Sequence, residues 1–279
     1  MRLKKLLSQY YYAHIHDSPW GCRLRLLLSK TPVAELRPFS ARAAISDLFV
    51  WRVDDTWDTS FDIFNISSFV YPEDAPQERC HLIFFDGQGQ KIADAEISLA
   101  PFERKILQIA DYIGTARGLG TFAVFHHTPC DVRFAAHKTH LTERGYIAYH
   151  RKGDHLKSYC HGNLQAISQA PGQNGYSYVA ATAAPSRYHP QLILSDSPLI
   201  ELIYTNPSPR AQPLIVHLFD RAGDKIGERT ENVPARSVRM LRIDNPDGAI
   251  HTFDNVGRVI MWRPVIKKHY ATHFDVMHG

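Results

Sequence analysis

The sequence predicts an all-β protein made of two tandem β-sandwich domains that are related by internal duplication. Short apolar stretches recur about every 8–12 residues, and Gly, Pro, Asn and Asp stand between them. A pattern of about 70 residues occurs twice along the chain, as repeat architectures require. No segment of either copy has the long 3.6-residue period of an amphipathic helix.

The repeat is clearest between residues 85–92 and 219–226, which are offset by 219 − 85 = 134 positions. The same offset continues without a gap to the next strand. The matched pairs are Phe85 with Phe219, Asp86 with Asp220, Gly89 with Gly223, Lys91 with Lys225, Ile92 with Ile226, Leu107 with Leu241 and Ile109 with Ile243.

Each copy of the repeat predicts a β-hairpin. In the second copy, an apolar strand ends at Phe219 and a turn runs from Asp220 to Asp224. Gly223 supplies the positive φ angle that such a turn needs, and Asp220 can accept hydrogen bonds from the backbone of the turn. Lys225 then begins the return strand.

The repeat and the composition of the chain set the predicted domain boundaries. Residues 1–40 form an N-terminal lead-in, residues 41–165 the first β-sandwich, residues 166–190 a linker rich in Pro, Gly, Asn and Ser, and residues 191–279 the second β-sandwich. Within the linker, residues 176–179 are a possible first strand of the second copy. The first copy also carries an extension rich in tyrosine and histidine.

Composition and charge exclude several functions. The 32 Lys and Arg exceed the 28 Asp and Glu by four, too few to predict nucleic-acid binding without clustering, and Lys267–Lys268 is predicted to be solvated surface. No apolar run reaches the about 20 residues of a membrane span, and no signal-peptide core is found. The prediction is a cytoplasmic protein.

The four cysteines, at positions 22, 80, 130 and 160, fit a reducing compartment. No two of them have CxxC spacing, so neither a zinc motif nor a redox motif is predicted. The chain also lacks a GxSxG elbow and a phosphate-binding loop. We therefore expect no catalytic residues, no resident metal and no cofactor.

The second copy resembles the sensory rhodopsin transducer family of small β-sandwich domains. The resemblance covers mainly residues 200–275 and, more faintly, residues 61–137. Its motifs are Ile203–Asn206, Val233–Ser237, Leu241–Asn245, Gly257–Ile260 and Pro264–His269. The first copy departs from the family pattern, with Leu99–Glu103 where the second has Val233–Ser237, so the resemblance does not support a site at that position in the first copy. The resemblance implies an often oligomeric domain that binds a small molecule or a protein, with a sugar-like ligand favoured.

One candidate ligand site lies on equivalent strands of the two copies. If residues 131–140 form a strand, alternation places Arg133 and His137 on one face, followed by His140. Arg263 and His269 take similar positions in the second copy. An Arg fork with His suits a sugar or a carboxylate, and Trp51, Trp57 or Trp262 could stack on a sugar ring. The alternative is an ordinary solvent-facing strand.

The tyrosine- and histidine-rich extension over residues 146–163 is the second candidate site. Tyr149, His150 and His161 are its proposed ligand-binding residues. Three interpretations stay open: a small-ligand pocket, an interdomain loop with structural histidines, and a metal site. The metal ligands would come from the set His137, His140, His150, His155, His161, Cys160 and Asp154, although no spacing matches a known zinc pattern.

These observations predict a non-enzymatic protein that binds a small polar molecule, possibly a sugar, or acts in sensing as a transducer. One alternative is a structural protein whose sheets build a homo-oligomer or bind a protein partner. A second alternative is a His-dependent metalloenzyme. The extension of the first copy is where function is expected first, because the second copy keeps the family-like motifs and the first has diverged.

Overall fold

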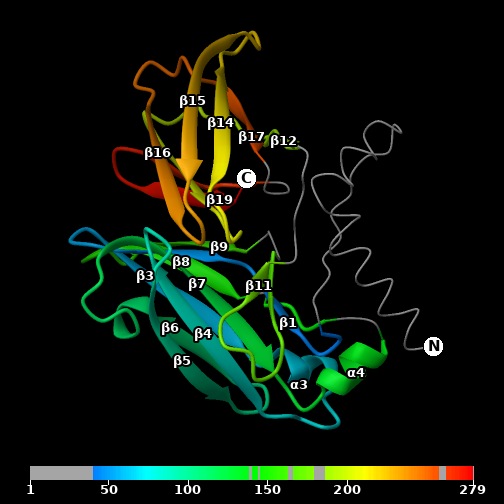
Figure 1. Cartoon of the computed structure of the whole chain (residues 1–279). Coiled ribbons are helices and arrows are strands. Elements are labelled where there is room, and N and C mark those ends of the chain that lie inside the picture. Colours follow the sequence, from blue (N-terminus) through cyan, green and yellow to red (C-terminus); the bar gives the residue numbers. More distant parts are fainter. Residues whose placement is uncertain are drawn as a thin grey trace, which may run out of the picture.

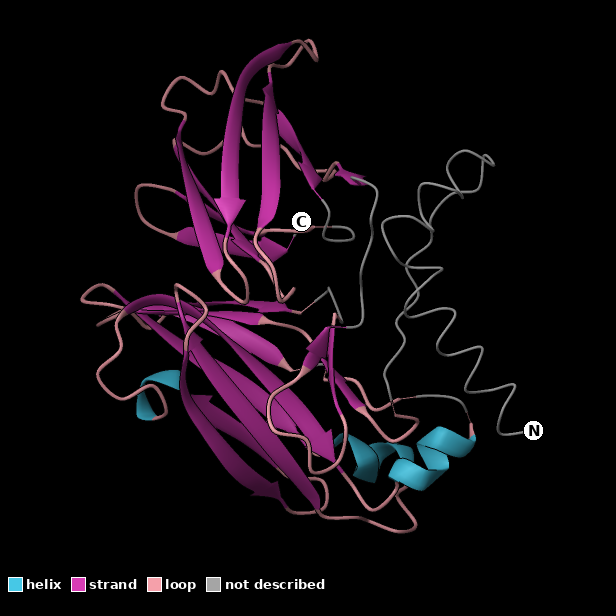
Figure 2. Cartoon of the chain, in the orientation of Figure 1, coloured by secondary structure: helices cyan, strands magenta, loops and turns pink. Residues whose placement is uncertain are grey.

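The structure, a computed structural model, describes residues 40–137, 140–143, 145–162, 166–178, 186–257 and 262–278. The predicted lead-in therefore lies almost wholly outside the described residues. The described part of the chain is all-β apart from three short helical segments (Figures 1 and 2). These are α3 (Ile66–Val70), η2 (Ile109–Asp111) and α4 (Asp131–Ala136). No helix of the described part is long and apolar enough to cross a membrane.

Two four-stranded antiparallel sheets, between residues 49 and 161, form most of the first half of the molecule, residues 40–162, which lies below the second half in Figure 1. One sheet has the order β2-β7-β4-β5 and the other the order β6-β3-β8-β9. Their strands are β2 (Phe49–Val53), β3 (Trp57–Phe64), β4 (Glu78–Asp86), β5 (Lys91–Leu99), β6 (Arg104–Gln108), β7 (Gly118–His127), β8 (Tyr146–Arg151) and β9 (Lys157–His161).

The second half, residues 186–278, has two four-stranded sheets with corresponding strand orders, β12-β17-β14-β15 and β16-β13-β18-β19. Their strands are β12 (Ser186–Tyr188), β13 (Leu199–Thr205), β14 (Gln212–Phe219), β15 (Lys225–Val233), β16 (Val238–Asp244), β17 (Thr252–Gly257), β18 (Val265–His269) and β19 (Phe274–His278). A fifth sheet of three strands joins β1 (Ala44–Ser46), β10 (Ile167–Gln169) and β11 (Ser177–Tyr178).

This sheet organisation corrects the predicted architecture of two tandem β-sandwich domains. The described chain forms five small antiparallel sheets. Four of them have four strands each, the number found in a β-propeller blade. The fifth sheet pairs Ala44–Ser46 with Ile167–Gln169, which the sequence had placed in a linker. Alternation and turn spacing identify antiparallel strands, but they do not specify how many sheets the strands form or which sheets meet.

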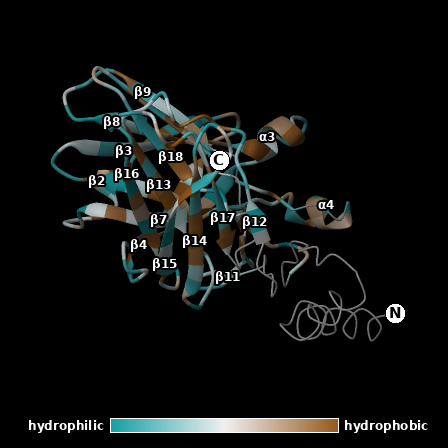
Figure 3. Ribbon diagram, turned by 90° about the horizontal axis from the view of Figure 1, so that it is seen from above, coloured by the Kyte–Doolittle hydropathy of each residue, from teal (hydrophilic) through white to brown (hydrophobic). Residues whose placement is uncertain are grey.

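Hydrophobic clusters fill the spaces between these sheets. One cluster takes Trp51, Phe84 and Phe122 from one sheet of the first half and Phe61 and Tyr149 from the other. A second cluster does the same in the second half, around Tyr204 and Trp262. In Figure 3 many strands change between hydrophilic and hydrophobic along their length, and α3 is largely hydrophobic. Burial of every second apolar side chain thus explains why these segments form strands that pack through one face.

The last strand, β19, belongs to the second half but also packs against the first. Phe274 and Val276 join the hydrophobic cluster of the first half, where the Phe274 ring lies 4.6 Å from the Trp57 ring. The backbone N–H of Val276 donates to Ser158 Oγ at 2.9 Å, across 118 positions of sequence. The core of the first half is therefore completed by residues from the far end of the described chain.

The predicted hairpins are confirmed at both copies of the repeat. Asp86 Oδ1 accepts from the backbone N–H of Gln88 and Gln90, both at 2.9 Å. Asp220 Oδ1 accepts in the same way from Ala222 and Asp224, also at 2.9 Å. Gly89 and Gly223 have φ angles of 80° and 89°. The repeated sequence is thus a repeated turn, in which the aspartate satisfies two backbone donors.

Residues 131–136 are helical, so the predicted strand over residues 131–140 is wrong. Asp131–Ala136 forms α4, and the backbone N–H of His137 closes its last turn onto Arg133 O at 3.0 Å. Residues 138 and 139 lie outside the described part. A segment this short, with polar and apolar residues mixed, is compatible with one or two helical turns as well as with a strand. In the structure, Phe134 packs against Cys130 and Leu141.

Candidate functional site

A buried ionic cluster lies where the two halves meet. Arg52 on β2 donates through Nη1 to Glu201 on β13, at 2.9 Å from Oε2 and 3.2 Å from Oε1. His269 on β18 places Nε2 at 3.1 Å from the same Oε2 atom. Burial alone would raise the pKa of Glu201, but the contact with His269 and the charge of Arg52 lower that pKa to about 2. The Glu201 carboxylate is therefore ionised.

Lys267 is the unusual member of this region, because its side chain is fully buried. Its Nζ atom lies 3.8 Å from the centroid of the Tyr149 ring and 4.4 Å from that of Trp57. Nζ has no hydrogen-bond partner within the described ranges. Burial, with the nearby charge of Arg52, lowers the pKa of Lys267 to about 7. Lys267 and Lys268 are thus buried, whereas the sequence predicted solvated surface.

Replacing Lys267 with methionine is expected to raise the free energy of unfolding by about 1–2 kcal/mol, because the ammonium is desolvated without an acceptor. The gain should shrink as the pH rises from about 7 to 10.5, since the folded-state pKa is the lower one and the unfolded chain binds the extra proton. Urea denaturation of the two proteins measures the difference.

Lys268 is the matched control for that substitution. Its Nζ atom donates to Asp196 at 2.6 Å and to Ile193 O at 3.0 Å, so its charge is compensated. Lys268→Met should therefore lower the free energy of unfolding by about 1–3 kcal/mol. Equal losses at both positions would contradict the distinction drawn between the two lysines.

The predicted ligand residues are spread over several places. Tyr149 is fully buried beside Lys267 and donates from its hydroxyl to Val50 O at 2.8 Å, whereas His269 lies in the ionic cluster with Glu201. His161 and Arg263 line a small cavity between the halves. There the Nε2 atoms of His161 and His278 lie 2.9 Å apart, and Arg263 stands over the Tyr188 ring at 5.5 Å.

The other four predicted residues form no common site with these. Arg133 is on the surface of α4, 2.5 Å from Asp74, and His137 ends that helix. His150 lies near the end of β8, where burial and the charge of Lys157 lower its pKa. His140 lines a cavity beside β7, and burial lowers its pKa.

The tryptophans that the sequence offered for stacking on a sugar ring are core residues. Trp51 and Trp262 have no exposed surface, and Trp57 is 4% exposed. The Trp51 indole N–H donates to Phe85 O at 3.1 Å and that of Trp262 to Thr205 O at 2.6 Å. Both indole N–H groups therefore stabilise the fold. None of the three tryptophans exposes a ring face on which a sugar could stack.

A polar groove that the sequence did not predict lies along β4 and β5, beside the turn that follows β10. Its centre is Gln169, whose Oε1 atom lies 3.0 Å from His81 Nδ1 and 2.9 Å from His127 Nε2. The Gln169 amide donates to Gly175 O at 2.7 Å, which fixes its orientation. The lining residues with polar side chains are Arg79, His81, Asp94, Glu96, His127, Gln169, Gln173 and Asn174.

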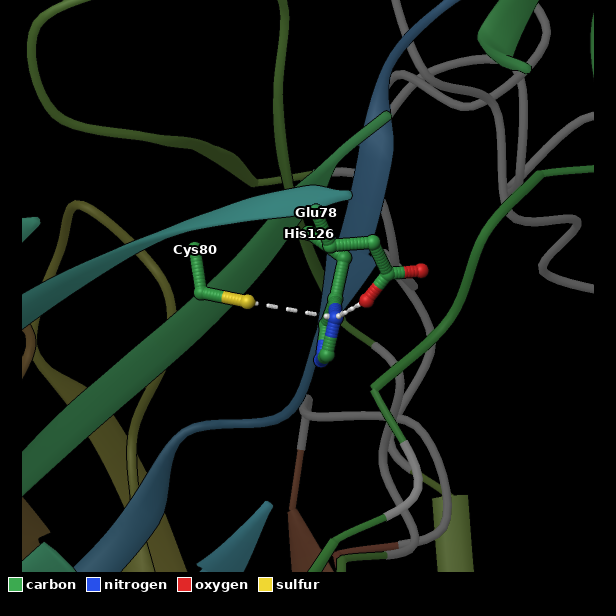
Figure 4. Close-up of side chains that lie close together, drawn as sticks. All are labelled: Glu78, Cys80 and His126. Atoms are coloured by element: carbon green, nitrogen blue, oxygen red, sulfur yellow. Dashed lines mark hydrogen bonds and ion pairs between the residues drawn. The ribbon is translucent and has the colours of Figure 1, made fainter. Parts of the chain in front are cut away.

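A second unpredicted cluster is buried between β4 and β7 (Figure 4). His126 has carboxylates on both sides: Nδ1 is 2.7 Å from Glu78 Oε2, and Nε2 bonds to Glu143. Cys80 Sγ lies 3.3 Å from the same Nδ1 atom. The donor atoms of Glu78, Cys80 and His126 all lie within 4.8 Å of one another, so these three side chains could hold a metal ion.

Electrostatics in this cluster favour a charged imidazole when no metal is bound. Burial would lower the pKa of His126, but the charge of Glu143 outweighs it, and that pKa is well above 6.5. Burial would raise the pKa of Glu78, whereas the hydrogen bond and charge of His126 lower it. Burial raises the pKa of the Cys80 thiol. The cluster is thus an imidazolium between two carboxylates, next to a neutral thiol.

One signal for this cluster was present in the sequence. Cys80 and His126 are direct partners in the register of β4 and β7, and Glu78 is two residues before Cys80 on the same face. Glu78, Cys80, Leu82 and Phe84 alternate along β4, and all four are buried. A glutamate on the apolar face of a strand is rare without a charged partner. The identity of that partner depends on strand pairing.

Comparisons with known proteins identify no family for this chain. No family model and no curated protein matches it. Among solved structures, it is similar to a β-glucuronidase from glycoside hydrolase family 2, with 9% identity and a TM-score of 0.19 over 84% of this chain. The chain spans 23% of the length of that protein, and a similarity this low carries no argument about fold or function.

Proposed function

We propose that the protein is a non-enzymatic binding module for a small, neutral, hydroxyl-rich molecule of the sugar class. The observation that carries the proposal is the groove around Gln169, in which one fixed amide holds two histidine rings at the surface of the sheet. Such a preorganised set of polar groups costs little further ordering when a ligand binds.

The charges in the groove favour a neutral ligand. Arg79 stands 3.9 Å from Glu96, and Asp94 lies 3.5 Å from His81 and 3.1 Å from Lys91. The acidic and basic groups thus compensate each other. Sugar hydroxyls donate and accept together, so the carboxylates can accept from them while Arg79 and the amides of Gln173 and Asn174 donate. The earlier resemblance to transducer domains, still a prediction, agrees with a binding role.

The test is a titration of the full chain with a panel of neutral mono- and disaccharides, followed by calorimetry and thermal unfolding. A ligand at 100 times its Kd should stabilise the protein by about 2.7 kcal/mol. The Arg79 side chain is 64% exposed and comes no closer than 3.9 Å to Glu96, so its guanidinium is available to donate to a ligand. Arg79→Ala should therefore weaken binding about tenfold or more.

Arg242→Ala is the matched control, because Arg242 is 61% exposed and forms a single 3.3 Å ion pair on the other half. It should leave the affinity unchanged. The proposal is wrong if no saccharide binds, or if the two arginine variants bind equally well.

A second candidate function is an interaction protein, which an exposed aromatic patch favours. Phe69 on α3 is 62% exposed and Phe102 is 50% exposed, and their rings lie 5.8 Å apart. Large apolar side chains that gather at the surface often mark binding sites for proteins. Sedimentation of the wild type and of a Phe69→Ser, Phe102→Ser double variant separates this candidate, since a change in association state would support it.

A further inference from the structure

The buried cluster of Figure 4 has the donor set of a transition-metal site. Glu78 contributes a carboxylate oxygen, Cys80 a sulfur and His126 the ring nitrogen Nδ1, from neighbouring strands of one sheet. All three residues are buried, and the Glu78 and His126 side chains are 0% and 1% exposed. A tetrahedral ion with bonds of about 2.0–2.3 Å separates its donors by roughly 3.4 Å. The 3.3 Å between Cys80 Sγ and His126 Nδ1 matches that spacing.

The Glu78 oxygen stands closer, at 2.7 Å from His126 Nδ1, because it accepts the Nδ1 proton when no metal is bound. A metal replaces that proton, and the carboxylate then has to withdraw by less than about 1 Å to reach the tetrahedral spacing. Its other oxygen is held by the backbone N–H of Ser67 at 2.6 Å and by the Ser67 hydroxyl. The anchored oxygen keeps Oε2 aimed at the cluster while the side chain adjusts.

Glu143 is positioned like the carboxylate that orients the metal-bound histidine in many metal sites. It bonds Nε2 of His126, on the side of the ring opposite Cys80 and Glu78, and its second oxygen accepts from the backbone N–H of Gly145. A histidine that binds a metal through one nitrogen usually donates its other N–H to such a group, which fixes the tautomer and strengthens the ligand. With Nε2 turned to Glu143, Nδ1 is the ring nitrogen of His126 that can bind a metal.

We propose that Glu78, Cys80 and His126 bind one divalent cation of the zinc class, with Glu143 as the positioning residue for His126. A thiolate with an imidazole selects zinc or cobalt over magnesium and calcium, which prefer sites made of oxygen alone. Binding releases the thiol proton of Cys80 and the Nδ1 proton of His126, since the metal takes the place of both. The three protein ligands leave a fourth position for water or another ligand.

A small cavity lies beside the site. His126 also lines the small cavity along β7 that is bordered by His127, Asp131, Phe134, His140 and Leu141. Asp131 and the histidines give that cavity polar walls. No known zinc motif marks these ligands in the sequence, because they have neither CxxC nor HExxH spacing.

The experiment uses the purified full chain, stripped with a chelator and then titrated with Co²⁺ and, separately, Zn²⁺. Cobalt in this site should bind at one equivalent and show a thiolate-to-cobalt charge-transfer band together with the intense visible bands of tetrahedral coordination. Zn²⁺ should displace the cobalt and remove both signals, as the affinity order of these ions requires for such a site.

Three variants assign the ligands. Cys80→Ala should abolish the charge-transfer band, while Cys130→Ala, which changes a buried cysteine of another hydrophobic cluster, should keep it. Glu143→Gln should keep the band but weaken cobalt binding about 10–100-fold, an effect that a role in packing alone would not produce. Circular dichroism before the titration establishes that each variant is folded.

The wild-type spectrum decides the question even if a variant fails to fold. A band that depends on Cys80 and binds at one equivalent supports the proposal. Absence of cobalt binding to the wild type, a cobalt spectrum without a thiolate band, or a band that Cys130→Ala removes and Cys80→Ala keeps would overturn it.

Discussion

Replacing His126 with leucine in the presence of a chelator is expected to lower the free energy of unfolding by about 3–5 kcal/mol. The substitution leaves Glu78 and Glu143, whose side chains are at most 1% exposed, facing the same space without a cation. Losing one partner of a buried ionic group costs more than the group itself contributes, because the remaining charge has neither water nor a counter-ion. Urea denaturation at about neutral pH measures the loss.

Two further variants show whether the loss of stability in His126→Leu comes from charge or from packing. His273→Gln changes an exposed histidine and should alter the free energy of unfolding by less than about 0.5 kcal/mol. The triple variant Glu78→Gln, His126→Leu, Glu143→Gln removes the charges together, so it should be more stable than His126→Leu alone. A triple variant that loses as much as the sum of its single substitutions would contradict the electrostatic account.

Replacing Glu201 with glutamine should lower the free energy of unfolding by about 3 kcal/mol at neutral pH. The pKa of Glu201 falls from 4.5 to about 2 on folding, and each unit corresponds to about 1.4 kcal/mol. Because the folded-state pKa is the lower one, the stabilisation is complete above 4.5 and is lost as the pH falls toward 2. The difference between wild type and variant should therefore vanish in acid.

Asp244→Asn is the control for Glu201→Gln. The Asp244 side chain is 73% exposed and makes one 3.3 Å ion pair with Arg242, so its replacement should cost less than about 1 kcal/mol. Urea denaturation of the three proteins across the acid range gives the comparison. A Glu201 effect that stays constant from neutral pH to about pH 3 would contradict the proposed ionic cause.

The hairpins could be predicted from the sequence because their determinants are local. Asp86 and Gly89, like Asp220 and Gly223, shape turns through contacts within a few residues. The organisation of the sheets depends instead on distant pairs, such as Phe49 with Phe122. Alternation shows that a strand has a buried face, but it does not identify the sheet that buries it. The predicted β-sandwich architecture was wrong for this reason.

The candidate sites were harder to predict. Residue types identify segments of the chain that are rich in functional side chains, but they do not show which segments meet in space. The segment around Arg133 was interpreted as a strand and is a short helix, which removed the shared face on which that site depended. Glu78, His126 and Glu143 are far apart in the chain and meet only through strand pairing and the loop before β8. Gln169 reaches the groove in the same way, from a segment predicted to be a linker.

The position of Phe274 and Val276 in the core of the first half has a consequence for folding during translation. A ribosome finishes β9 long before it reaches β19, since Ser158 and Val276 are 118 residues apart. At about 5–20 residues per second, the nascent first half waits on the order of ten seconds for those two side chains. Through that interval Trp57 lacks its aromatic neighbour, and the emerging chain presents an apolar surface that chaperones can bind.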